Sequence, residues 1–554
     1  MHYILCFLCL LISSKAFAEI YYVDATGGDN GDNGLTEETA WQTVAYVNSQ
    51  SFSAGTTVLF KRGETWAEGL VPDSGNASQP VWYSAYGSGD LPVIRNVDCS
   101  GKSYVAIDFI HFYNTTSGVY TVLINNGNHI RFDSCTITAS GSGWTTVHMY
   151  NDAEYNEFLN CMVNNFITGS QIDTFRMKFD SNYNHIRNCT ISNGTHYAFV
   201  LEGYDDGANA GRTCAYNHIS GNTIQQSEGS CVAGIFGVNS NVIENNYITG
   251  MYDSAYNADE VSLRLIGAYN IVRNNLITDN TDSGGYGSQL HAWQPSGYAA
   301  PDINGNHYYN NTFHEIDNLM TSLSIGSGSG SRYVRNNVFK NNIFFASGVT
   351  EWKIALGCAG YGLTNMSNND FLYNLIYEES TSNTFCYDGS SRTVAYMESN
   401  YSSDFADNIV QDPDLLANYR PDEGSVCIDN GTTLTYVSSS DGSGTQFNVD
   451  DTRYFTDGDN AGYLYKATGD IILVGSTEAT ISDVNHSTGV ITVTSSISWK
   501  QNDPVSLPYN GDAPDIGFYE TEEDEGEPPL AAPKALVVIS PRMIRGSMRL
   551  RDGM

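Results

Sequence analysis

One short segment recurs eight times through the middle of the chain and constrains its fold more than any other feature. The Cys or second Asn of each copy marks a period that varies from 24 residues (Asn222 to Asn246) to 36 residues (Asn275 to Asn311). Periods of this size are typical of solenoids, in which each coil stacks only on its neighbours. The copies read HIRFDSCTIT, YNEFLNCMVN, YNHIRNCTIS, YNHISGNTIQ, SNVIENNYIT, YNIVRNNLIT, GNHYYNNTFH and RYVRNNVFKN, and their markers are Cys135, Cys161, Cys189, Asn222, Asn246, Asn275, Asn311 and Asn337.

Each copy alternates apolar and polar residues and contains Asn or Gly turns, and none shows the apolar stripe of a helix. The repeat therefore predicts an all-β solenoid. Small thiols pack well inside such a stack, and buried Asn side chains can hydrogen-bond to one another. We expect one internal column formed by Cys135, Cys161, Cys189, Asn222, Asn246 and Asn275.

The charge balance limits the possible partners. The 554 residues carry a net charge of −36, with only 26 Lys and Arg. Such an acidic chain is unsuited to nonspecific nucleic-acid binding and to anionic membrane surfaces. We expect a soluble monomer with no nucleic-acid partner.

The first eighteen residues resemble a secretory signal. The apolar run YILCFLCLLI precedes Ala16-Phe17-Ala18, an A-x-A cleavage site that places Glu19 at the mature start. We expect a secreted or periplasmic protein that has no membrane association after cleavage. Of the nine remaining cysteines, Cys214 with Cys231 and Cys358 with Cys386 are candidate disulfides, although sequence alone cannot pair them.

Changes in pattern suggest the domain boundaries. The repeat region with an N-terminal cap spans 19–430, and the period is lost at 431–512, which reads as a small all-β insertion. This insertion reads as a surface appendage over the end of the solenoid. A closing strand follows at 513–520, and 521–554 form an acidic, Pro-containing linker with a basic tail of unassigned role.

Both ends of the repeat region resemble a known superfamily. YYVDATGGDNGDNGLTEETAWQTVAYVN, TTVLFKRGETW and QPVWYSAYGSGDLPVI resemble the entry coils of right-handed parallel β-helix proteins of the pectate-lyase-like superfamily, and NIVQDPDL, GSVCIDNGT and APDIGFYE resemble their closing coils. The resemblance implies a right-handed parallel β-helix whose open end is covered by an N-terminal helix. It does not fix an activity, because this fold carries several.

The strand before each repeat predicts one outward face. Alternation should bury one set of side chains and expose the other. The expected inward set is Met149, Met177, Phe179, Phe199, Leu201, Leu263, Leu265, Leu290 and Leu323. The expected outward set is His148, Tyr150, Arg176, Lys178, Asp180, Glu202, Arg264, Gln289 and His291, with His196 and Trp293 beside it.

This outward set predicts a binding groove. Arg176, Lys178 and Arg264 share one face although cations are scarce in the chain. Tyr150 and Trp293 add aromatic surfaces that can stack on sugar rings. A basic and aromatic strip on a solenoid suits an acidic polysaccharide, and the substrate-binding candidates are His148, Tyr150, Arg176, His196, Glu202, Gln289 and Trp293.

Acidic loops border the same face. Asp, Asn and carbonyl oxygens are the ligands that Ca²⁺ prefers, although no EF-hand spacing is present. A calcium site is therefore an expectation at these loops. Its candidate ligands are Asp205, Asp206, Asp259 and Glu260, near Asp253, Asp279 and Asp282.

Three function classes fit the residue types. In β-elimination of a uronate, Lys178 would act as the base, with Arg264 and His291 completing the catalytic set, because a cation must stabilise the developing charge. MKFDSNYNHIRNCTISN and VSLRLIGAYNIVRNN resemble the Lys- and Arg-bearing coils of alginate-lyase and chondroitinase-B-like members. The alternatives are a glycoside hydrolase that uses Asp180 and Glu202, and a non-catalytic glycan-binding or adhesin solenoid.

Overall fold

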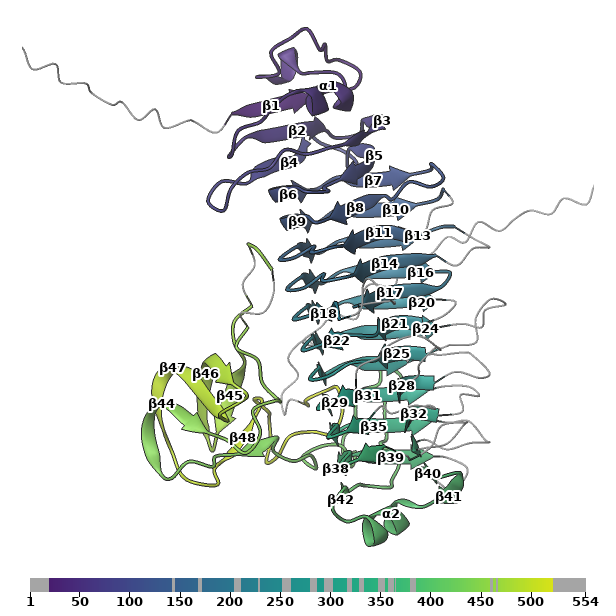
Figure 1. The fold of residues 1–554 in the computed structure, drawn as a ribbon, viewed down its shortest axis with the longest axis vertical. Coiled ribbons are helices and arrows are strands. Elements are labelled where there is room, and N and C mark those ends of the chain that lie inside the picture. The colour runs from purple at the N-terminus through teal and green to yellow at the C-terminus, as the bar shows by residue number, and fades with distance from the viewer. Residues whose placement is uncertain are drawn as a thin grey trace, which may run out of the picture. The chain divides into compact units, whose positions relative to one another are not determined.

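The computed structural model describes residues 19–521, except for 142–144, 168–171, 204–210, 228–229, 252–260, 279–285, 293–301, 316–320, 328–332, 347–353, 357–362, 364, 379–384, 459–461 and 465–466. Within these residues the chain is an all-β parallel solenoid with a small antiparallel sheet, as the sequence predicts. Three faces, A, B and C, run along the solenoid (Figure 1).

Face A is a 14-stranded parallel sheet to which each complete coil contributes one strand. Its strands, in order, are β1 (Ile20–Val23), β2 (Thr57–Lys61), β4 (Val81–Tyr86), β6 (Ser103–Asp108), β9 (Asn128–Asp133), β12 (Glu157–Leu159), β15 (His185–Arg187), β19 (His218–Ser220), β23 (Val242–Glu244), β26 (Ile271–Arg273), β30 (His307–Tyr309), β34 (Val338–Lys340), β38 (Asp370–Leu372) and β42 (Phe405–Ala406).

Faces B and C together form a 23-stranded sheet, because β5 pairs with both β7 of face B and β8 of face C. Face B contains β3 (Thr65–Leu70), β5 (Val93–Asp98), β7 (His111–Asn114), β10 (Thr136–Ala139), β13 (Met162–Asn165), β16 (Thr190–Gly194), β20 (Thr223–Ser227), β24 (Tyr247–Met251), β27 (Leu276–Thr278), β31 (Thr312–Glu315), β35 (Ile343–Ala346) and β39 (Leu375–Glu378). Face C contains β8 (Val122–Asn125), β11 (Thr145–Tyr150), β14 (Asp173–Lys178), β17 (Tyr197–Glu202), β21 (Ser230–Ile235), β25 (Val261–Leu265), β28 (Tyr286–Ala292), β32 (Thr321–Ser327), β36 (Ile354–Leu356) and β40 (Phe385–Tyr387), with β41 (Ser390–Arg392) antiparallel to β40.

Short helices lie at both ends of the solenoid (Figure 1). The 3-10 helix η1 (Glu37–Thr39) and α1 (Val44–Ser49) lie at the N-terminal end, where α1 buries Val44 and Val47 in the core. At the other end α2 (Val394–Asn400) buries Val394 and Met397. These apolar side chains cover core that the terminal coils would otherwise leave open. Two smaller parallel sheets lie between faces, β18 (Cys214–Ala215) with β22 (Val238–Asn239), and β29 (Ile303–Asn304), β33 (Val334–Arg335) and β37 (Met366–Ser367).

The predicted Cys and Asn column is buried inside the solenoid. The Cys161 amide donates to Cys189 Sγ at 3.4 Å, and the Cys189 amide to Asn222 Oδ1 at 2.8 Å. From Asn222 onward each side chain also donates to the next, at 2.9–3.1 Å. The Asn members are Asn222, Asn246, Asn275, Asn311, Asn342, Asn374 and Asn408.

Asn337 belongs to a different column, so its assignment as the last marker was wrong. It accepts from Asn306 and donates to Asn369, whereas Asn311 is followed by Asn342. Two Asn side chains per coil therefore form two separate internal ladders. Aligning RYVRNNVFKN by its RNN segment assigned Asn337 to the Cys and Asn column, where Asn342 belongs. The second ladder contains Asn156, Asn184, Asn217, Asn241, Asn270, Asn306, Asn337 and Asn369.

The cysteines contradict one candidate disulfide. Cys214 is a free buried thiol, so its proposed pairing with Cys231 is wrong. Cys386 is disulfide-bonded, and Cys358 lies outside the described residues.

Near the C-terminus, an antiparallel sheet packs against the side of face A. In order its strands are β43 (Thr435–Tyr436), β48 (Pro504–Ser506), β45 (Ile471–Val474), β46 (Thr477–Asn485), β47 (Val490–Trp499) and β44 (Gly442–Asn448). Its core includes Val242, Ile271, Tyr309 and Val338 of four face A strands. The sheet thus covers a lateral surface, and the expectation that it covers the end of the solenoid is wrong. Among the described residues, none forms a helix of the length and apolarity that a bilayer span requires.

Candidate active site

The candidate groove residues lie in two outward columns on face C. The strand register of β11, β14, β17, β21, β25 and β28 aligns His148, Arg176, Val200, Ala233, Arg264 and Gln289 in the first. The second aligns Tyr150, Lys178, Glu202 and Ile235. Neighbours within a column are about 4.8 Å apart at the backbone.

The inward set is largely as expected from alternation. Met149, Met177, Phe199, Leu201, Leu263 and Leu265 are fully buried, and the side chains of Leu290 and Leu323 lie outside the description. Phe179 was assigned wrongly, because β14 ends at Lys178 and Phe179 turns out of the strand at φ 51°. Its half-buried ring lies 4.2 Å from Lys178 Nζ.

Four charged side chains of face C form a continuous ion-pair network. Arg176 lies between two carboxylates: its Nε donates to Glu202 at 3.1 Å and its Nη2 also bonds Glu202, while its Nη1 lies 3.3 Å from Asp173. Lys178 Nζ lies 3.1 Å from the other Glu202 oxygen. His196 Nδ1 in turn contacts Asp173 at 2.8 Å. The basic strip is therefore largely neutralised by carboxylates that flank it.

His148 lies next to this network but does not join it. Its ring stacks on Tyr150 at 4.6 Å and contacts Tyr120 at 4.9 Å. Burial, with the positive charges of Arg176 and Lys178, lowers the pKa of His148 to about 3. Neither ring nitrogen finds a hydrogen-bond partner among the described residues. His148 is therefore neutral over the physiological range.

Asp180 is not placed as the hydrolase hypothesis requires. It follows the strand at φ 58°, its Oδ1 accepts from the Thr213 amide at 2.8 Å, and its Oδ2 lies 3.4 Å from Arg212. The Asp180 carboxylate thus stabilises the turn after β14. The Glu202 carboxylate is bound to Arg176 and Lys178. The carboxylate that shares Arg176 with Glu202 is Asp173.

Arg264 is farther from Lys178 than elimination at one sugar would allow. Three strand spacings separate β14 from β25, or about 14 Å. Arg264 points outward but is only 6% exposed, and Glu202 is 8% exposed, so the expectation of two freely exposed side chains is wrong. Side chains stacked at the strand spacing cover one another.

Several candidate residues lie partly or wholly outside the described residues. The backbones of Gln289 and His291 lie in β28, but their side chains are outside the description. Trp293 and all proposed calcium ligands, Asp205, Asp206, Asp259 and Glu260, with Asp253, Asp279 and Asp282, lie outside the described residues. Within the described part, no three His, Cys, Asp or Glu side chains gather as a metal site would require.

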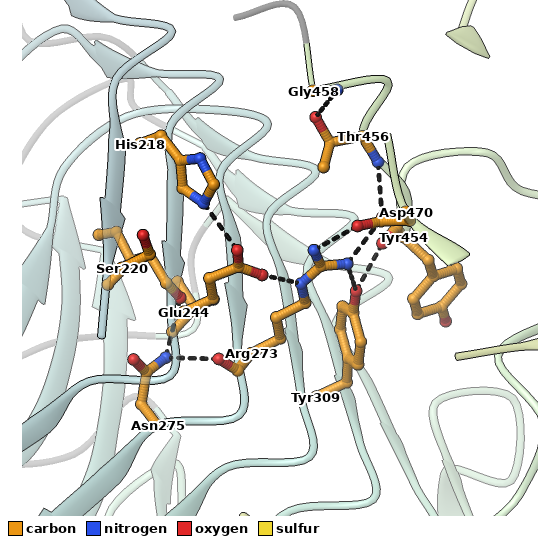
Figure 2. Close-up of polar contacts among 12 residues, drawn as sticks. His218, Ser220, Glu244, Arg273, Asn275, Tyr309, Tyr454, Thr456, Gly458 and Asp470 are labelled. Atoms are coloured by element: carbon orange, nitrogen blue, oxygen red, sulfur yellow. Dashed lines mark hydrogen bonds and ion pairs between the residues drawn. The ribbon is translucent and has the colours of Figure 1, made fainter. Parts of the chain in front are cut away.

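Face A carries a second polar cluster that the sequence reasoning missed (Figure 2). Arg273 is central: its Nε donates to Glu244 at 2.6 Å, its Nη1 to Tyr309 at 3.0 Å, and its Nη1 and Nη2 to Asp470 at 2.8 and 2.6 Å. His218 contacts Glu244 at 2.6 Å. Asp470 directly precedes β45 of the antiparallel sheet, so the cluster fastens that sheet to face A. The sequence did contain a signal for this cluster. The successive repeat copies NHISG, NVIEN and NIVRN each contain one titratable residue, and these are His218, Glu244 and Arg273.

Comparisons with known proteins show distant likeness in fold. No protein-family model matches the chain, and no curated protein does. A pectate lyase structure aligns over 91% of this chain and 96% of its own, at 14% identity and a TM-score of 0.39. The structure of a family 6 polysaccharide lyase from Pseudopedobacter saltans aligns over 68% of this chain and 93% of its own chain, at 15% identity and a TM-score of 0.34.

Glycoside hydrolases also appear among the similar structures. A family 136 lacto-N-biosidase from Eubacterium ramulus aligns over 65% of this chain at 13% identity and a TM-score of 0.38, and the chain spans 64% of that enzyme's length. The fold thus resembles that of both polysaccharide lyases and glycoside hydrolases, and the reaction has to be inferred from the site itself.

Proposed function

We propose that the protein is a secreted enzyme that cleaves an acidic polysaccharide by β-elimination on face C. The observation that carries this proposal is the ion pair between Lys178 and Glu202, at 3.1 Å, beside Arg176. Partly buried charges are costly, and one of the outward columns continues as apolar Val200 and Ala233. A solenoid needs no such network for its stability, which favours a role in chemistry.

In this mechanism Lys178 and Glu202 act as a proton-exchanging pair. Lys178 transfers a proton to Glu202, and its neutral amine then removes the proton α to the uronate carboxylate. The released electron pair forms the new C=C bond as the glycosidic C–O bond breaks, and protonated Glu202 or water returns a proton to the leaving oxygen. Arg176 stabilises the negative charge that develops on the uronate.

Elimination fits this cluster better than hydrolysis. A glycosidase of the paired-carboxylate type needs one carboxyl protonated and one ionised. Among the described side chains of face C, no second carboxylate is placed to act with Glu202 on a sugar, because Asp173 is bound by Arg176 and His196 and Asp180 stabilises the turn after β14. We place Arg264 in the binding of a neighbouring sugar, since it lies about 14 Å along the face. Calcium at the acidic loops is a further part of this proposal.

The test is incubation with alginate, pectate, glycosaminoglycans, carrageenan and neutral glycans. Ultraviolet absorbance of unsaturated ends and reducing ends should be recorded together. The proposal expects both signals on an acidic polymer. Reducing ends alone would establish hydrolysis instead, and binding without either signal would establish a non-catalytic adhesin.

A further inference from the structure

A column of stacked aromatic rings follows the turn between face C and face A. Successive ring centroids are 4.6, 5.1, 4.9 and 4.9 Å apart, and the last two pairs are within 5° of parallel. Every member has a left-handed backbone with φ of 55–58°, which fixes the direction of its side chain. The column consists of Tyr104, His129, Tyr155, Tyr183 and Tyr216.

One ring is missing from this column. The Tyr216 amide donates to Asn239 O, the Ser240 amide to Ala268 O and the Tyr269 amide to Asn304 O, so Tyr216, Ser240 and Tyr269 occupy successive equivalent positions. Ser240 also has the left-handed conformation, with φ 55°. Its small side chain leaves Tyr216 and Tyr269 two strand spacings apart, or about 9.6 Å.

Both bordering rings are exposed and held in place. Tyr216 is 41% exposed and Tyr269 is 52% exposed, whereas Tyr155 and Tyr183 inside the column are half-buried. Tyr216 is fixed by stacking on Tyr183. Tyr269 lies over Gly305, where an added Cβ would come within 2.8 Å of its ring, and its hydroxyl accepts from Asn304 Nδ2 at 2.9 Å. The rings therefore do not close the gap.

We propose that this gap, the Ser240 slot, binds one pyranose ring of a neutral glycan between Tyr216 and Tyr269. A ring placed midway would lie about 4.8 Å from each Tyr, within the range of aromatic stacking contacts. A pyranose has apolar C–H faces for the two rings and a hydroxyl rim for Ser240 and solvent. Arg453, which lies beside Gly305, is already paired with Asp451 at 2.8 Å, which favours an uncharged sugar.

The proposal of a binding slot rests on the proposed function only in that both assume a carbohydrate ligand. It lies at the corner of the solenoid, outside the Lys178 and Glu202 network. It would hold a neutral stretch or side branch of the polysaccharide while face C acts on the acidic part. Its function is binding without turnover.

The test fills the slot without disturbing the turn. Ser240→Tyr places a ring where five equivalent tyrosines already have the same left-handed backbone conformation, so we expect an unchanged or higher Tm. Binding is measured by calorimetry with hexasaccharides of β-1,4-linked glucose, mannose, xylose and N-acetylglucosamine. We expect at least one to bind, with affinity about tenfold weaker in Ser240→Tyr and in Tyr269→Ala.

Two controls separate the slot from general effects. Ser240→Ala keeps the gap and should retain the affinity, as should Tyr436→Ala, which removes a 43% exposed tyrosine from the antiparallel sheet. Lys178→Ala should bind the hexasaccharide normally while losing turnover, so failure of the slot and failure of the proposed reaction are distinguishable. No binding of any hexasaccharide, or equal binding by Ser240→Tyr and the unmodified protein, would overturn the proposal.

Discussion

At the scale of single residues, Lys178 and Glu202 form the centre of the candidate active site. One carboxylate contacts both an ammonium and a guanidinium, while a neutral histidine lies alongside. Charge changes at these positions therefore have separable effects on binding and on chemistry.

Lys178→Ala should reduce turnover by about 10²–10⁴-fold, since it removes the group that transfers the proton. Lys178→Arg should not restore activity, because a guanidinium stays protonated. Turnover on the substrate identified by the panel is the measurement, with circular dichroism to verify folding. Near-normal turnover in Lys178→Ala would remove this residue from the mechanism.

Glu202→Gln should lower kcat and KM together. The amide cannot accept the proton from Lys178, yet it removes the negative charge that competes with an anionic substrate for Arg176. Asp180→Asn is the matched control and should leave kcat within a few-fold, because this carboxylate contacts Thr213 and Arg212. Loss of activity in Asp180→Asn with retention in Glu202→Gln would contradict the assignment.

Asp108 on face A should make stability depend on pH. Burial raises the pKa of Asp108 to about 6, and its Oδ1 has no hydrogen-bond partner among the described residues. A carboxyl with a raised folded-state pKa contributes its stability below the unfolded-state value of about 3.9 and loses it as pH rises through about 6. Asp108→Asn should therefore raise Tm at pH 8 and have little effect at pH 4. An equal gain in Tm at pH 4 and at pH 8 would exclude titration of Asp108 as the cause.

At the scale of elements, the internal Asn ladders set the register of the coils. Asn246 accepts from the Asn222 amide and side chain and donates to Ile219 O and Asn275 Oδ1. The ladders thus bond each coil to the next through buried amides, in addition to the strand pairing.

Asn246→Leu should lower the free energy of unfolding by about 2–4 kcal/mol, because it leaves several buried polar groups without partners. Cys189→Ala, in the same column, should cost less, since a thiol hydrogen bond is weak and the cavity is small. Denaturant unfolding of both variants is the measurement. A larger loss in Cys189→Ala would show that packing, not the amide ladder, dominates the column.

At the scale of the whole molecule, Arg273 links the antiparallel sheet to the solenoid. It is 4% exposed and contacts Glu244, Tyr309 and Asp470. The Arg273 guanidinium and His218 hold the pKa of Glu244 far below its usual range. This stabilisation is present above the ordinary carboxyl pKa and is lost only as the pH falls toward the depressed value.

Arg273→Leu should weaken docking of the antiparallel sheet by about 3–5 kcal/mol, because two buried carboxylates lose their counter-charge. We expect a second, earlier calorimetric transition and faster proteolysis within residues 431–512. Combining Arg273→Leu with Glu244→Gln and Asp470→Asn should recover part of the loss. A single unchanged transition in Arg273→Leu would show that apolar packing alone holds this sheet.

The resemblance of the entry coils predicted the N-terminal helix, and the repeats predicted the solenoid and the Cys and Asn column. Repeats report these directly, because every coil meets the same stacking constraint and must satisfy it with similar residues. Alternation also predicted the inward side of face C, including Met149, Met177 and Leu201. It failed at Phe179, where the strand had already ended in a left-handed residue.

Which charges meet depends on how the coils stack, and the sequence does not contain that information. The pairing of Lys178 with Glu202 depends on the register between β14 and β17, and the contact of Arg273 with Asp470 joins residues 197 positions apart. Coil lengths vary, so spacing in the chain does not give distance along a face, and Arg264 lies three strands from Lys178. The repeats already show Ser240 where the neighbouring copies have Tyr, but only the stacked coils show that these rings form one column in which Ser240 leaves a gap.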